Sequence, residues 1–164
     1  MTFFKRILVT VAILLGLGFG PAAAPVRAEA AQGQETVLVQ MFRWWNAAIQ
    51  DPDGFTREAF GRYFTEDGAI MINGKVAVKG LDDLVTHFRA IQKRVEYVEI
   101  VVPFEEEFVS ASGDRIFTYH LIKSRADGKD VLMHAMGYAD IRDGKIALIH
   151  LVRAEAEPES AGSK

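Results

Sequence analysis

The spacing of apolar residues divides the chain into a mainly helical first part and a second part made of strands. From Glu35 to Gln50 apolar residues recur every three or four positions, which predicts a helix. The same period predicts a short helix over residues 55–64 and a longer one over residues 81–94. Alternating patterns predict strands over residues 69–72, 75–78, 96–109, 115–124, 130–141 and 145–154. Helices followed by a strand meander indicate an α+β fold rather than a parallel α/β sheet.

The pattern indicates one domain over residues 31–154. Pairs such as Asn73-Gly74 and Asp143-Gly144 are turn sequences that separate consecutive strands without a long linker. There is no internal repeat. Residues 155–164 form a charged tail of small residues, which we expect to fray.

The first thirty residues have the pattern of a secretory signal peptide. Lys5 and Arg6 precede the uncharged run Ile7–Phe19, and Ala28-Glu29-Ala30 is a small-residue cleavage sequence. We predict cleavage after Ala30, because cleavage after Ala24 would leave proline as the first residue. An uncleaved anchor is the alternative, but its apolar run is shorter than the roughly 20 residues of a membrane span. The expected location is the periplasm or the cell exterior.

Charge and cysteine content exclude several classes of function. Without residues 1–30 the 19 basic and 22 acidic residues become 16 and 21, and the net charge moves from −3 to −5. An acidic domain without a clustered basic face is not expected to bind nucleic acid. The absence of cysteine excludes disulfides, thiolate metal sites and thiol nucleophiles. After cleavage we expect no membrane association.

Turn geometry predicts which side chains share a face of the last three strands. A two-residue Asp127-Gly128 turn places Thr118 opposite Gly137 and His120 opposite Ala135. The inner, helix-facing side then holds Ile116, Thr118, His120, Ile122, Met133, Ala135, Gly137 and Ala139. With a bulge at the last turn it also holds Ala147, Ile149 and Leu151. The outer side holds His134, Met136, Tyr138, Leu148, His150 and Val152, although a register slip of one residue would invert the faces.

Three stretches carry a resemblance to a known family: YFTEDGAIMING at residues 63–74, GLDDLVTHF at residues 80–88 and GYADIRDGKIALIHLV at residues 137–152. Their order and spacing resemble SnoaL-like domains of the NTF2-like superfamily. The resemblance implies a cone in which three N-terminal helices pack on a strongly curved, mostly antiparallel sheet around an apolar pocket. Such domains include isomerases, epoxide hydrolases and dehydratases as well as proteins that only bind, and the fold alone does not decide between them. No cofactor is implied.

The resemblance also allows the catalytic positions of related enzymes to be checked. The general base of ketosteroid isomerase-like domains falls on Ile72, and their second acid falls on Gly137, or on Met136 if the turn slips. Their helix-one tyrosine corresponds to Arg43 or Trp44, and the last-strand aspartate of epoxide hydrolase-like domains corresponds to Leu151. Apolar residues therefore stand where those enzymes carry acids, and the dehydratase pattern matches only in residue types.

Two histidines are the remaining candidates for chemistry. His87 borders the apolar stripe of the third helix, and His120 lies on the predicted inner face. A histidine pair can exchange protons near neutral pH, but each is also compatible with a structural role bonded to the backbone. A zinc site would need a third ligand, for which Glu105–Glu107 is the nearest source. Three consecutive glutamates are typical of a solvated edge, so we predict no metal.

Two hypotheses follow from these residues. The first is an exported binding protein that holds a small hydrophobic ligand, or a protein partner, without turnover. Its predicted binding residues are Trp44, Tyr63, Ile72, Thr118, Ala135, Gly137, Ile149 and Leu151. The second is a cofactor-independent lyase or isomerase that uses His87 and His120. In either case the apolar outer face of the sheet predicts a homodimer.

Overall fold

The computed structural model of the protein describes residues 35–156. The predicted signal peptide and nearly all of the predicted tail lie outside the described residues. The elements in chain order are α1 (Val37–Ala48), α2 (Arg57–Gly61), β1 (Phe64–Ile72), β2 (Lys75–Lys79), α3 (Leu81–Gln92), β3 (Tyr97–Ile100), β4 (Glu106–Val109), β5 (Arg115–Ala126), β6 (Lys129–Arg142) and β7 (Lys145–Glu155). None of the described helices has the length and apolar character needed to span a bilayer.

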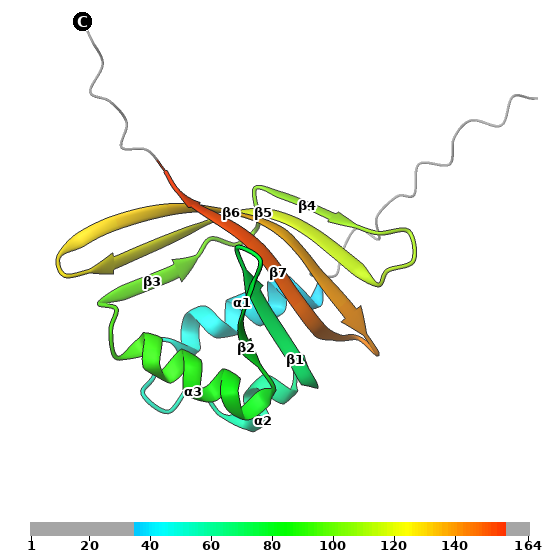
Figure 1. The fold of residues 1–164 in the computed structure, drawn as a ribbon, viewed down its shortest axis with the longest axis horizontal. Coiled ribbons are helices and arrows are strands. Elements are labelled where there is room, and N and C mark those ends of the chain that lie inside the picture. Colours follow the sequence, from blue (N-terminus) through cyan, green and yellow to red (C-terminus); the bar gives the residue numbers. More distant parts are fainter. Residues whose placement is uncertain (1–34, 157–164) are drawn as a thin grey trace, which may run out of the picture.

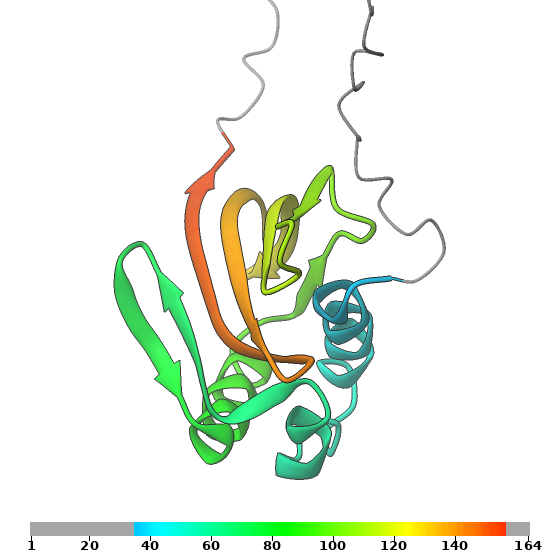
Figure 2. The same ribbon diagram turned by 90° about the vertical axis from the view of Figure 1, so that its right-hand side faces the viewer.

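The described strands form one curved sheet in the order β2-β1-β7-β6-β5-β3, with β4 also pairing with β5. β1 and β7 run parallel, whereas every other pairing is antiparallel. The long strands β5, β6 and β7 bend over the helices, which gather on the concave side of the sheet (Figures 1 and 2). The predicted α+β fold, with three helices against a curved and mostly antiparallel sheet, is confirmed.

The predicted register of β5 and β6 is also confirmed. Thr118 lies opposite Gly137 and His120 lies opposite Ala135. The expected bulge in the β6–β7 hairpin is present between Asp140 and Ile141. It changes one detail, because Ile146 is fully buried opposite Ile141 while Ala147, predicted to face inward, is only partly buried. The bulge therefore brings Ile146 into the core.

The predicted elements were wrong in two regions of the chain. The single strand expected over residues 96–109 is divided into β3 and β4, which pair with different parts of β5. Pro103 lies in the interruption, and a proline has no N–H to donate to a ladder. The helix expected over residues 55–64 ends at Gly61, because β1 begins at Phe64 and is longer than expected.

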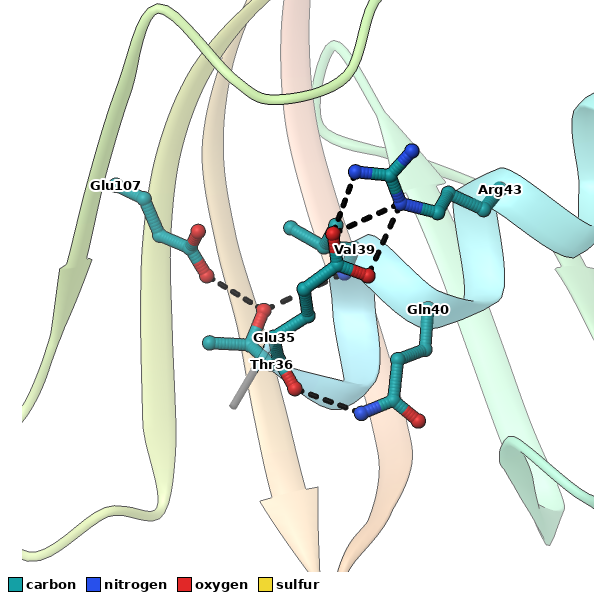
Figure 3. Close-up of polar contacts among 6 residues, drawn as sticks. All are labelled: Glu35, Thr36, Val39, Gln40, Arg43 and Glu107. Atoms are coloured by element: carbon teal, nitrogen blue, oxygen red, sulfur yellow. Dashed lines mark hydrogen bonds and ion pairs between the residues drawn. The ribbon is translucent and has the colours of Figure 1, made fainter. Parts of the chain in front are cut away.

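The first helix is anchored to the sheet at its N-terminus (Figure 3). The Thr36 hydroxyl caps α1 by accepting from the Val39 N–H at 3.3 Å, and it donates to Glu107 of β4 at 2.5 Å. Arg43, two turns along, donates from Nε to both carboxylate oxygens of Glu35 at 2.9 and 3.0 Å. A single capping residue therefore joins the start of the helix to an edge strand.

The other ends of α1 and α3 are held by side-chain amides. Asn46 donates to the Ile100 carbonyl at 2.7 Å and accepts from the Ile100 N–H at 2.9 Å, as a neighbouring strand would. Gln92 at the end of α3 donates to the carbonyls of Ile49 at 2.9 Å and Asp51 at 2.8 Å. These bonds hold α1 beside β3 and the end of α3 against the end of α1.

Candidate functional site

A cavity of about 440 Å³ lies between the helices and the concave face of the sheet. Most of its lining is aliphatic or aromatic and comes from α1, α3 and five strands. The apolar lining residues are Met41, Phe42, Trp45, Phe64, Ile70, Ile72, Ala77, Phe88, Ile91, Ile100, Ile122, Ile149 and Leu151. A cavity of this size and character is typical of sites that hold small organic molecules.

Four lining residues are basic, and none of the described lining residues is acidic. His87 comes from α3, Arg94 from the turn after it, His120 from β5 and Arg153 from β7. His120 is fully buried, whereas Arg94 is exposed. The cavity therefore extends from the core to the surface, and its polar groups lie at both depths.

The deepest polar group is the imidazole of His120. Its Nδ1 lies 2.9 Å from the Thr118 hydroxyl oxygen. The rings of Phe42 and Phe104 pack against the imidazole with centroid distances of 5.6 and 5.1 Å. Burial lowers the pKa of His120 to about 4, so the ring is neutral at pH 7. If the Thr118 hydroxyl donates to Nδ1, then Nε2 carries the proton. In the opposite tautomer Nδ1 would donate to the Thr118 oxygen, and two groups would then lack a partner: Nε2 of His120 and the hydroxyl proton of Thr118.

Two buried polar atoms of the lining have no hydrogen-bond partner among residues 35–156. They are Nε2 of His120 and Nε1 of Trp45. An indole N–H can only donate, and the favoured tautomer makes the imidazole nitrogen a donor too. Because an unsatisfied buried donor costs about 1–3 kcal/mol, an acceptor that reached either atom would stabilise the protein.

Three basic residues lie together nearer the surface, and we call His87, Arg94 and Arg153 the basic cluster. Burial, together with the positive charges of Arg94 and Arg153, lowers the pKa of His87 below its usual 6.5. The His87 ring is therefore mostly neutral at pH 7, and the charge of the cluster comes from the two guanidinium groups. Burial also lowers the pKa of Arg153.

The structure places five of the ten residues predicted from the sequence on this cavity. His87 and His120 line it together, and so do Ile72, Ile149 and Leu151. Its lining does not include Trp44, Tyr63, Thr118, Ala135 or Gly137.

These five residues have other positions around the site. Trp44 and Tyr63 stack on each other at 5.3 Å, beside the guanidinium of Arg62. Thr118 bonds to His120, and Ala135 is fully buried. At Gly137 a Cβ atom would lie 1.9 Å from the His150 carbonyl oxygen, so the backbone of β7 fills the space next to it. The space that these small residues leave is therefore not all available to a ligand.

Sequence reasoning missed Trp45, Arg94 and Arg153 as site residues. Arg94 follows His87 by seven residues, or two helical turns, and Arg153 follows the inward-facing Leu151 by two residues. The periodicities therefore contained this information, but charged residues at the ends of elements are usually solvated and did not indicate a site.

The metal site considered at the histidines lacks a set of ligands in the described residues. Across residues 35–156 there is no group of three histidine, aspartate or glutamate side chains that could hold an ion. Of the glutamates considered as a third ligand, Glu107 accepts a hydrogen bond from Thr36.

Comparison with solved structures identifies the fold. An NTF2-like protein of unknown function from Exiguobacterium sp. 255-15 superposes with a TM-score of 0.59 at 19% identity, over 75% of this chain and 100% of that one. A putative SnoaL-like polyketide cyclase from Jannaschia sp. CCS1 superposes with a TM-score of 0.55 at 15% identity, over 75% of this chain and 91% of that one. A LEH-like epoxide hydrolase from M. tuberculosis superposes with a TM-score of 0.53 at 17% identity, over 72% of this chain and 83% of that one.

No protein-family profile and no curated protein sequence matches the chain. At these identities the structural likeness concerns the fold, and the activities of the other proteins remain their own. The chain has the NTF2-like fold that the three sequence stretches predicted.

Proposed function

We propose that this protein binds a small, mostly hydrophobic molecule in the cavity between its helices and the concave face of its sheet. The observation that carries the proposal is the cavity itself, about 440 Å³ lined mainly by aliphatic and aromatic side chains. The two unpartnered polar atoms, His120 Nε2 and Trp45 Nε1, support a ligand that also carries a hydrogen-bond acceptor.

The test is mass spectrometry of small molecules extracted from the purified, denatured protein. Two variants of β2 control it. Ala77 is exposed and lines the cavity, so Ala77→Trp is expected to obstruct it without disturbing the core. Val76, its neighbour, is 61% exposed and outside the lining, so Val76→Trp adds the same ring elsewhere.

We expect one compound, or a family of related compounds, from the wild-type protein and Val76→Trp, and a much smaller amount from Ala77→Trp. Equal yields from all three proteins would mean that the compound binds elsewhere. In addition, His120→Ala removes the deepest polar group and is expected to lower the yield of any compound that bonds to it.

A second candidate function is supported by the two histidines on one cavity. His87 and His120 both line it, as a lyase or isomerase acting through them requires. However, both rings are mostly neutral at pH 7, and the described lining has no carboxylate to orient or protonate them. Incubating the extracted compound with the protein distinguishes the two functions. Binding alone leaves its mass and isomer composition unchanged, whereas catalysis changes them in a way that His87→Ala and His120→Ala abolish.

We also propose that the protein is exported and acts in the periplasm or outside the cell. Support comes from the basic start, the thirteen-residue apolar run and the cleavage sequence ending at Ala30. Cell fractionation followed by N-terminal sequencing tests this proposal. A mature chain beginning at Ala31 supports it, and an uncleaved cytoplasmic chain contradicts it.

Finally, we propose a homodimer through the outer face of the sheet. Met136 and Val152 lie opposite each other on β6 and β7 and are 59% and 61% exposed, and the exposed Phe117 lies on neighbouring β5. Sedimentation should show a dimer that Met136→Arg converts to monomers. The same change at Val76, an exposed position on β2, should leave the dimer intact.

A further inference from the structure

The arginines of the described chain differ in whether a carboxylate pairs with them. Five of them form ion pairs with carboxylates, and all of these pairs lie at the surface. They are Arg43, Arg57, Arg115, Arg125 and Arg142. Arg94 and Arg153 line the cavity and have no carboxylate at ion-pair distance within residues 35–156. Arg62 and Arg89 also have no ion pair within these residues, but neither lines the cavity. Arg62 lies beside the Trp44 ring, and Arg89 donates to the Phe55 carbonyl. Both arginines that line the cavity therefore lack an acidic partner.

The position of Arg153 makes this absence informative. Arg153 is partly buried beside Leu151, and burial lowers its pKa. Removing a guanidinium from water without a counter-charge is unfavourable, so an unpaired arginine at such a position costs folding free energy. Stability alone would favour an apolar or amide side chain there. A ligand that supplied a negative charge would offset this cost.

The other polar groups of the lining have the same character. Nε of Arg94 donates to the Ala90 carbonyl at 3.1 Å, which uses one of its donors and leaves its terminal nitrogens available. Burial and the positive charges of both guanidinium groups lower the pKa of His87. The unpartnered donor of Trp45 and the proposed donor of His120 belong to more deeply buried residues of the lining. Apart from the imidazoles and the weakly accepting sulfur of Met41, no described lining side chain has an atom that can accept a hydrogen bond.

We propose that the bound molecule is an amphiphile with an oxyanion headgroup, held between Arg94 and Arg153 with its apolar body in the cavity. This inference rests on the proposed binding function and specifies the chemical class of the ligand. A guanidinium binds a carboxylate or a phosphate in a forked geometry, and two guanidinium groups at the open end of an apolar cavity select for such a group.

Isothermal titration of the protein with matched probes tests the proposal. Decanoate, monodecyl phosphate, decan-1-ol and decylamine carry the same ten-carbon chain with different headgroups, and 2-naphthoate and 2-naphthol form an aromatic pair. We expect the anions to bind about tenfold or more tightly than the alcohols, and the amine to bind most weakly. The stronger of decanoate and monodecyl phosphate identifies the preferred oxyanion.

Variants assign the selectivity to the two arginines. The double change Arg94→Gln with Arg153→Gln is expected to reduce anion affinity to that of the alcohols while leaving alcohol binding unchanged. Arg142→Gln is the control: it removes a positive charge from a surface ion pair with Asp67 and should change the affinity for neither anions nor alcohols. Arg153→Gln alone should leave the melting temperature of the ligand-free protein unchanged or raise it.

The outcomes separate the two proposals. Equal binding of anions and alcohols by the wild-type protein would overturn the oxyanion proposal and leave hydrophobic binding intact. So would a double variant that loses both classes alike, or a clear fall in the melting temperature of Arg153→Gln, which would indicate a structural arginine. Failure of every probe to bind would overturn both proposals.

Discussion

The two faces of the central strands β5, β6 and β7 use similar residues to different ends. On the outer face the Tyr119 hydroxyl lies 2.7 Å from Nδ1 of His134, and the Tyr138 hydroxyl lies 3.2 Å from Nδ1 of His150. On the inner face His120 has one bond, to Thr118, and its Nε2 is buried without a partner in the described chain. The outer histidines are partly exposed and can complete their hydrogen bonding with water.

This difference shows where the fold retains unused bonding capacity. Buried polar atoms in proteins are nearly always paired, so the exceptions need an explanation. Here the exceptions and the unpaired guanidinium of Arg153 belong to the lining of one cavity. Exposed apolar side chains such as Met136 are instead concentrated on the outer face. The inner face is thus suited to a small ligand and the outer face to another protein surface.

The largest predicted effect comes from Gly137, where the backbone of β7 lies close to that of β6. Gly137→Ala would place a Cβ atom 1.9 Å from the His150 carbonyl oxygen and 3.0 Å from Leu151 Cα. Because both neighbours are backbone atoms, β6 and β7 must separate, and we expect a loss of at least about 3 kcal/mol in the free energy of unfolding. Urea denaturation measures it.

Gly61→Ala is the matched control for this substitution. A Cβ at Gly61, the last residue of α2, would meet only the Leu81 side chain at 3.6 Å, an ordinary contact. We expect a change of less than about 1 kcal/mol, because alanine is the better helix former. Similar losses of unfolding free energy at the two positions would show that β6 and β7 can move apart at little cost, contrary to this prediction.

The next effect concerns pH and the buried imidazole of His120. Its pKa is about 4 in the folded protein, against 6.5 for an ordinary histidine. Between these values the unfolded chain binds the proton more readily than the folded protein does. The contribution of the buried neutral imidazole to the free energy of unfolding is therefore complete above pH 6.5 and is lost as pH falls toward 4. The shift corresponds to up to about 3 kcal/mol. His87, whose pKa is also lowered, contributes in the same direction, with Arg94 and Arg153 facing it.

The measurement is the free energy of unfolding from pH 8 to pH 4 for the wild-type protein and His120→Gln. The acid-induced loss should be smaller in the variant by up to about 3 kcal/mol. At pH 8, where the histidine is neutral in both states, the two proteins differ only by the packing of the substituted side chain. Parallel pH curves would mean that His120 is accessible to protons in the folded protein.

The sequence predicted the architecture well because its periodicities are local and strong. The Asp127-Gly128 turn determined the pairing of β5 with β6 and therefore placed His120 on the inner face. The division of residues 96–109 was not predicted, because a strand pattern does not show where Pro103 interrupts pairing with a distant strand. Alternation also misplaced Ala147, since one bulge residue changes which neighbour faces inward.

The candidate site was predicted only in part, for a different reason. Alternation and helical period identified Ile149, Leu151 and both histidines, and the family resemblance identified Ile72. Whether an inward-facing small residue leaves an open space depends on backbone approach in three dimensions, as Gly137 shows. Similarly, an arginine becomes informative only when its lack of a carboxylate is known. That depends on residues far apart in the sequence.

The smallest predicted effect compares the same change, removal of one hydroxyl, on the two faces. Thr118→Val leaves Nδ1 of His120 buried without its partner, and we expect a loss of about 1–3 kcal/mol in the free energy of unfolding. Tyr119→Phe removes the bond to the partly exposed His134, which water can replace, so we expect about 0.5–1 kcal/mol. Urea denaturation of both variants under one buffer condition measures the difference. Equal losses would mean that water reaches His120 as freely as it reaches His134, and the inner face would then no longer be the side with unmet donors.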